Sequence, residues 1–99
     1  MKKQLPHIPP GEILLEEFMK PLGISQNRLA RDLDVPVSRV AGIVKGTRTI
    51  TADTALRLGA YFGTSAEMWI RLQSTFDLRG ASRAVGAKIS ARVKRFEAA

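Results

Sequence analysis

The stretch SQNRLARDLDVPVSRVAGIVKG, residues 25–46, decides the fold of this 99-residue chain. It has the pattern of two short helices separated by a turn of three to four residues around Asp34–Pro36. Ser25 is a good N-cap for the first helix, because its hydroxyl can accept a bond from a free amide of the first turn. Pro36 suits the start of the second helix and Gly46 its end.

Each of these two helices has one apolar face. The first buries the stripe Leu29, Ala30 and Leu33, and the second the stripe Val37, Val40, Ile43 and Val44. The outer face of the second helix carries Ser38, Arg39, Gly42 and Lys45, and no acidic residue lies between positions 35 and 52. This spacing is typical of a helix-turn-helix, whose second helix enters the major groove of DNA.

Three more helices are predicted around this pair. Pro10 begins a helix that Pro21 and Gly23 end. Thr51 caps a helix that stops at Gly63, and Ser65 caps the last helix of the domain. The chain has no convincing strand pattern of alternating apolar and polar residues, so we predict an all-α fold with five helices.

The sequence divides into an extended lead-in at 1–9, a helical domain at 10–79 and a basic amphipathic tail at 80–99. Gly80 and Gly86 weaken the helical pattern of the tail, which can form a helix against a partner. Its apolar positions recur at helical spacing, at Val85, Ile89, Val93 and Phe96. Its basic residues Lys88, Arg92 and Arg95 share a different face and are interpreted as either solvated or phosphate-contacting.

Charge and composition limit the classes of function that this chain can have. The net charge is +7, with +3 at residues 35–50 and +5 at residues 79–99, which favours nucleic acid as the partner. The chain has no Cys and one His, so neither a disulfide nor a multi-His metal site is expected. With no signal peptide or membrane span expected, we predict a cytoplasmic location. No acid–base pair, metal set or phosphate loop is visible, so we predict neither an enzyme nor a cofactor.

Three segments, PGEIL at 10–14, ITADTALRL at 50–58 and FGTSAEMW at 62–69, resemble the HigA-type antitoxins, which are relatives of VapI. These antitoxins have a lambda-repressor-like, or XRE, helix-turn-helix. The resemblance covers residues 8–79 and implies a dimeric repressor that binds an operator palindrome in double-stranded DNA. It also implies an antitoxin that neutralises a small RelE-like ribonuclease in a type II toxin–antitoxin system.

The resemblance also assigns site residues. It places Val37, Ser38, Arg39 and Gly42 against DNA bases, and it places Ser25, Gln26, Asn27, Lys45, Thr47 and Arg48 against phosphates. Among the base contacts Arg39 is the strongest candidate, because a guanidinium can hold guanine O6 and N7 with two bonds. Candidates for a dimer or partner surface are Trp69, Phe76, Ile89 and Phe96, with Trp69 equally suited to the core.

Two departures from the family pattern matter. Asp34 stands in the inter-helix turn where the family has Gly, and Asp tolerates a left-handed backbone better than most residues. The +5 tail fits a basic toxin poorly, because like charges repel. Three alternatives stay open: a regulator without a toxin, a toxin-binding protein with weak DNA binding, and a module that acts on membranes or RNA through its tail.

Overall fold

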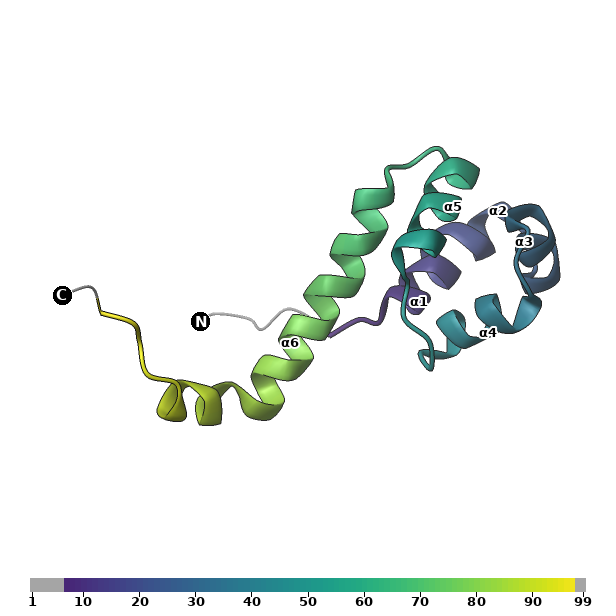
Figure 1. Cartoon of the computed structure of the whole chain (residues 1–99). Coiled ribbons are helices and arrows are strands. Elements are labelled where there is room, and N and C mark those ends of the chain that lie inside the picture. The colour runs from purple at the N-terminus through teal and green to yellow at the C-terminus, as the bar shows by residue number, and fades with distance from the viewer. Residues whose placement is uncertain (1–6, 98–99) are drawn as a thin grey trace.

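The computed structural model describes residues 7–97, which contain helices and connecting turns and no strand. In chain order the elements are α1 (Pro10–Ile13), η1 (Leu14–Met19), α2 (Lys20–Leu22), α3 (Gln26–Leu33), α4 (Val37–Lys45), α5 (Ala52–Phe62) and α6 (Ala66–Arg92) (Figure 1). α1, η1 and α2 follow one another without a break and together make one helix. Residues 7–97 therefore contain five helical segments, as predicted. Most of the expected 1–9 lead-in and the last two residues of the tail lie outside the described residues.

The first helix widens in its middle. Over η1 the bonds have π-helical spacing, and the Lys20 amide donates to the carbonyl of Leu15. This turn lies directly before Pro21, which has no N–H to donate, and a π-turn is one way in which a helix accommodates such a residue. Pro21 itself lies within the last helical turn, and the predicted end at Gly23 is confirmed. The helix ends after Leu22, where Gly23 takes the left-handed conformation with φ 65°.

Trp69 lies at the centre of the core and is fully buried. Its ring packs against those of Phe18 and Phe62, and its Nε1–H donates to the Thr64 hydroxyl at 2.9 Å. The assignment of Trp69 to a dimer or partner surface is therefore wrong, because the core already surrounds it. The other large, fully buried side chains are Leu14, Met19, Leu29, Leu58 and Val40, so η1, α3, α4, α5 and α6 contribute to one core.

A buried amide joins α6 to the segment before α5. The Gln73 side-chain oxygen accepts from the Ile50 amide at 2.8 Å, and its nitrogen donates to Asp77 at 2.9 Å. The Gln73 side chain is buried, so these bonds satisfy groups that would be costly to bury alone. The connection that carries Arg48 and Thr49 toward α5 is thereby held at Ile50.

α1 and α4 approach each other closely at Gly11. A Cβ built on Gly11 would lie 1.7 Å from the Ile43 carbonyl oxygen, which is a severe overlap. Gly11 therefore allows the two backbones to come within contact distance. This approach seats α4 against the first helix, while α3 packs on its other side.

A helix runs across the predicted boundary between the domain and its tail, at residues 79 and 80. α6 continues through Gly80 and Gly86 to Arg92 as one helix of 27 residues. The residues around the two glycines are mostly strong helix formers, such as Arg79, Ala81 and Ala84, and they offset the glycine cost. A Cβ at Gly80 would lie 3.6 Å from the ring of His7, which stacks on Phe76, and this is an ordinary contact distance.

The C-terminal half of α6 projects from the body of the molecule (Figure 1). Val85 and Ile89 are exposed, and beyond the helix so are Val93 and Phe96, the last at 88%. The predicted amphipathic pattern is thus present, but this chain does not cover its apolar face. No helix among residues 7–97 is both long and apolar enough to cross a bilayer.

We expect Gly11→Ala to destabilise the fold by about 2–3 kcal/mol, because its methyl group must displace backbone atoms of α4. Urea denaturation followed by circular dichroism measures this. Gly80→Ala is the matched control, since it is also a helical glycine but has ordinary contact space, and it should be neutral or stabilising by up to about 1 kcal/mol. Equal effects of the two substitutions would contradict the close-approach role of Gly11.

Candidate nucleic-acid interface

The turn between α3 and α4 is built from local bonds. The Ser25 hydroxyl accepts from the Arg28 amide at 3.1 Å, which confirms the predicted cap of α3. Asp34 ends α3 in the left-handed conformation with φ 59° and ψ 49°, as expected for the residue in the place of the family glycine. The Val35 amide then donates to the Ala30 carbonyl at 3.0 Å. These bonds fix the direction in which the chain enters α4.

Two side chains of α5 reinforce this arrangement. The Arg57 guanidinium donates from Nη1 to the carbonyls of Leu33 and Asp34, at 2.9 and 3.2 Å, where α3 has free acceptors. One turn further along, Tyr61 donates its hydroxyl proton to Asp32 of α3 at 2.8 Å. α5 therefore holds the end of α3 and the start of the turn.

The first turn of α4 is open to solvent. Pro36 precedes it and offers no side-chain acceptor, so the amides of Val37 and Ser38 have no acceptor within the helix. Val37 is 45% exposed, and Ser38 is exposed as well. The prediction that Val37 belongs to the apolar inner stripe is therefore wrong, whereas Val40 and Ile43 of that stripe are buried. An uncapped helix start with exposed side chains can approach an anionic partner closely.

Gly42 does not present an open outer face. It is buried, and a Cβ there would lie 2.9 Å from Cγ and Cδ of Arg48, whose methylene groups cover it. The expectation that Gly42 leaves room for a DNA base is therefore wrong. The loop after α4 folds back over Gly42 because the amides of Thr47 and Arg48 both donate to the Gly42 carbonyl, at 2.9 and 3.1 Å. Because Gly42 has no side chain, the methylene groups of Arg48 can lie directly against its backbone.

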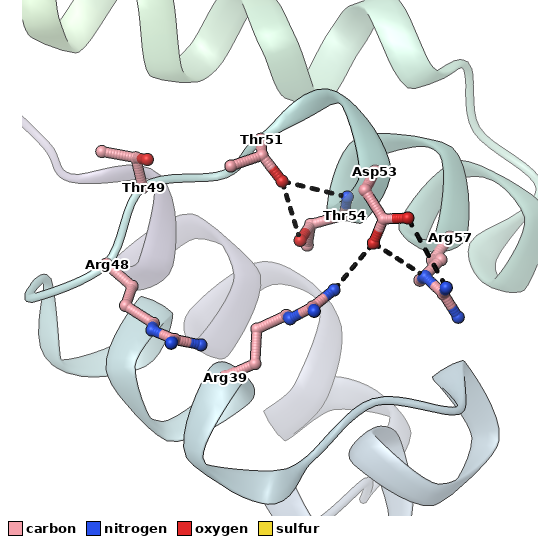
Figure 2. A pocket seen from close by; sticks show the side chains of 7 residues that line it. All are labelled: Arg39, Arg48, Thr49, Thr51, Asp53, Thr54 and Arg57. Atoms are coloured by element: carbon pink, nitrogen blue, oxygen red, sulfur yellow. Dashed lines mark hydrogen bonds and ion pairs between the residues drawn. The ribbon is translucent and has the colours of Figure 1, made fainter.

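Arg39 points toward a carboxylate on α5. Its Nη1 donates to Asp53 Oδ2 at 2.7 Å, and Arg57 Nε donates to the same oxygen at 2.9 Å (Figure 2). Figure 2 shows Arg39 and Arg57 approaching Asp53 from opposite sides. Asp53 lies in the first turn of α5, where the helix dipole favours a negative charge.

Bonds from Arg57 and, second, from Arg39 keep the pKa of the Asp53 carboxyl below its ordinary value. Asp53 is thus ionised at neutral pH and can hold both guanidinium groups. The three charged side chains, with Arg48, Thr49, Thr51 and Thr54, line a depression of about 430 Å³ beside α4 (Figure 2).

The other predicted contact residues lie on two segments, the start of α3 and the end of α4 with the loop that follows it. Ser25, Gln26 and Asn27 form the N-terminal end of α3, where backbone amides can receive a phosphate. Lys45, Thr47 and Arg48 follow at the far end of α4 and in its loop, and all three are exposed. The Thr47 hydroxyl already donates to the Gly42 carbonyl at 3.3 Å. The structure thus places the predicted residues other than Gly42 at exposed or half-buried positions of α3, α4 and the loop after α4.

Asp53 and Arg57 are the functional candidates that the sequence reasoning missed. Their spacing of four residues on one helix was a usable signal for an ion pair. The contact of Asp53 with Arg39 had no such signal, because it joins two helices across the loop at residues 46–51.

The four residues predicted for a dimer or partner surface differ in how far they are exposed. Trp69 belongs to the core, as described above, and Phe76 is half-buried beneath the ring of His7 at a centroid distance of 4.2 Å. Ile89, at 51% exposure, and Phe96 stay uncovered. An apolar surface available to a partner therefore remains at the C-terminal end of α6 and beyond it.

The chain matches known proteins over this same unit. A helix-turn-helix family model matches residues 15–69. Virulence-associated protein I of Dichelobacter nodosus is 50% identical over 82 residues, which are 83% of this chain and 76% of that protein. The chain belongs to this helix-turn-helix family.

Other members of this helix-turn-helix family support the placement. Antitoxin HigA-1 of Vibrio cholerae is 35% identical over 69% of this chain, and the match spans 64% of HigA-1. Among solved structures, Pseudomonas aeruginosa antitoxin HigA with the higBA promoter is 43% identical, with a TM-score of 0.88 over 93% of this chain and 100% of that one. Antitoxin GraA in complex with its operator is 42% identical, with a TM-score of 0.89 over 99% of both chains.

We expect Asp53→Asn to lower the free energy of unfolding slightly at pH 7, because its ion pairs are exposed, and to have no effect in strong acid. The folded-state pKa of Asp53 is depressed, so its stabilising effect is present above the unfolded-state pKa, about 3.9, and is lost as the pH falls through the folded-state value. Urea unfolding of both proteins between about pH 7 and about pH 2 measures the difference. A difference that does not change with pH would show that the carboxylate charge is not responsible.

Proposed function

We propose that this chain is a sequence-specific, DNA-binding transcriptional repressor that acts as the antitoxin of a type II toxin–antitoxin system. The observation that carries the proposal is the exposed, uncapped start of α4, with Val37 and Ser38 accessible and Arg39 beside them. Solved relatives with TM-scores of 0.88 and 0.89 are described with a promoter and with an operator, and this supports DNA as the partner.

In this proposal two groups of residues have different tasks on the duplex. Val37, Ser38 and Arg39 face the base edges of the major groove, where hydrogen bonds and methyl contacts distinguish base pairs. Ser25, Gln26 and Asn27 hold a phosphate on one side, and Lys45 and Arg48 hold phosphates on the other. Thr47, whose hydroxyl is bonded to the Gly42 carbonyl, shapes the loop from which Arg48 reaches the backbone.

The proposal includes a homodimer. A single α4 reads only a few base pairs, and proteins of this type gain affinity by placing two recognition helices about 34 Å apart, on successive turns of DNA. The uncovered apolar residues Ile89 and Phe96 favour the C-terminal end of α6 as a part of the dimer or partner surface.

We further propose a small RelE-like ribonuclease as the toxin partner, on the strength of the family resemblance and of the match to HigA-1. The second candidate is a transcriptional regulator without a toxin. The specific observation that favours it is the net charge of +5 on residues 79–99, because a basic surface repels a basic, RNA-binding toxin.

Arg39→Ala should weaken binding to DNA from the region upstream of the gene by about 1–3 kcal/mol, and leave binding to a scrambled duplex nearly unchanged. Titration of the wild-type and Arg39→Ala proteins into both duplexes, at two salt concentrations, measures these affinities. It tests both the proposed repressor function and the proposed base contact of Arg39. Lys45→Ala is the control: it should weaken both complexes and flatten the salt dependence by about one unit of slope. If wild type binds both duplexes equally, the repressor proposal is wrong; if Arg39→Ala weakens both equally, Arg39 is not a base reader.

The antitoxin role predicts rescue of growth. Cells that express a RelE-like ribonuclease encoded beside this gene should stop growing, and co-expression of the chain should restore growth through a complex that co-purifies. The Arg39→Ala variant should still rescue, because the role proposed for Arg39 is in DNA binding and its partner within the chain is the exposed Asp53. Failure of rescue despite tight operator binding would support the regulator without a toxin.

A further inference from the structure

One acidic side chain lies beside Arg39 of the proposed DNA-binding face, in the depression that Arg48 also lines. Asp53 is exposed, with 55% of its side chain accessible, and it contacts Arg39 of α4 and Arg57 of α5. Such a position is unfavourable for DNA affinity, because a carboxylate near the groove repels phosphates. Ion pairs at this exposure also contribute little to fold stability. Neither DNA affinity nor fold stability therefore explains why an aspartate stands at position 53, and we look for a functional reason.

The carboxylate is bonded to a framework of other fixed contacts. Arg57 donates to Asp53 Oδ2 through Nε at 2.9 Å, while its Nη1 is anchored to the carbonyls of Leu33 and Asp34 in the turn before α4. Thr51 caps the same helix and accepts from the Thr54 amide, so the first turn of α5 is itself fixed. Asp53 thus connects the guanidinium of Arg39 to the framework that positions α4 (Figure 2).

The contact leaves most of the Arg39 donors available. Arg39 donates through Nη1 to Asp53, and the described residues provide no other hydrogen-bond partner for its guanidinium. A guanidinium has five N–H groups in one plane, so a carboxylate on one edge orients the remaining donors. A flexible arginine must lose rotamer freedom on binding a base, whereas an oriented one has already lost it.

We propose that Asp53 is a specificity-determining positioning residue that orients Arg39 for base recognition and lowers the affinity for non-cognate DNA. This inference rests on the proposed function, in which Arg39 reads a base. On the cognate sequence, Arg39 bonds the base and Asp53 together, and this offsets the repulsion between the carboxylate and the phosphates. On other sequences Arg39 finds no matching base, so nothing offsets the repulsion between the Asp53 carboxylate and the phosphates. The difference in affinity between cognate and non-cognate DNA therefore increases.

The test compares two duplexes. One is selected from a random-sequence pool by the wild-type protein, and the other is its scrambled version. Asp53→Ala should bind the scrambled duplex more tightly and the selected duplex no more tightly than wild type. The ratio of the two affinities should fall by about tenfold, within the range of discrimination that one bidentate arginine supplies. A purely structural role of Asp53 would lower both affinities together and leave their ratio unchanged.

Two further variants separate the causes. Asp53→Asn keeps an acceptor for Arg39 but removes the charge, so its ratio should lie between those of wild type and Asp53→Ala. Glu67→Gln is the matched charge control, since it removes one exposed carboxylate at the start of α6, away from α4, and it should leave the ratio unchanged (Figure 1). Melting curves confirm that each variant is folded, and Asp53→Asn alone tests the idea if Asp53→Ala unfolds.

The outcomes distinguish the two proposals. If wild type discriminates between the duplexes and the aspartate variants keep its ratio, the role of Asp53 is overturned and the repressor function stands. If Glu67→Gln lowers the ratio as much as Asp53→Ala does, the effect is one of net charge, and the positioning role is overturned as well. If the pool yields no preferred sequence for wild type, the proposed function and this inference are both wrong.

Discussion

The position of α4 depends on the contact between the backbones of Gly11 and Ile43. No other residue type fits at position 11, because a Cβ would overlap the Ile43 carbonyl. The contact draws α4 against the first helix, and this exposes Val37 and Ser38 on the opposite side while Val40 stays in the core. The proposed reading face is therefore set by packing on the inner side of α4.

Much of the fold could be predicted because its determinants are local. Ser25, Thr51 and Ser65 each accept from the amide three residues ahead, and such caps can be recognised from a few neighbouring residues. Asp34 could be assigned a left-handed backbone for the same reason. By contrast, α6 continues past Gly80 because many helix-forming residues outweigh two glycines, and this depends on a sum over the whole segment.

The candidate site could be predicted only in part. Its residues lie on the α3–α4 unit, as the apolar stripes and the acid-free stretch indicated. Gly42 was misplaced because its burial depends on a loop that folds back and lays Arg48 across it. The pairing of Arg39 with Asp53 depends on how α4 and α5 cross, and no periodicity in the sequence reports a crossing between helices. Contacts between elements thus account for what the sequence pattern missed.

The length of α6 has a mechanical consequence. Its first half is held in the core by Trp69 and Gln73, whereas its second half extends from the body of the molecule and changes direction near its end (Figure 1). A molecule bound at this end would be connected to the core through the helix alone. Each residue turns the helix by about 100° and advances it by about 1.5 Å. The number of residues between Trp69 and Ile89 therefore determines on which side of the helix Ile89 stands, relative to the side that Trp69 buries.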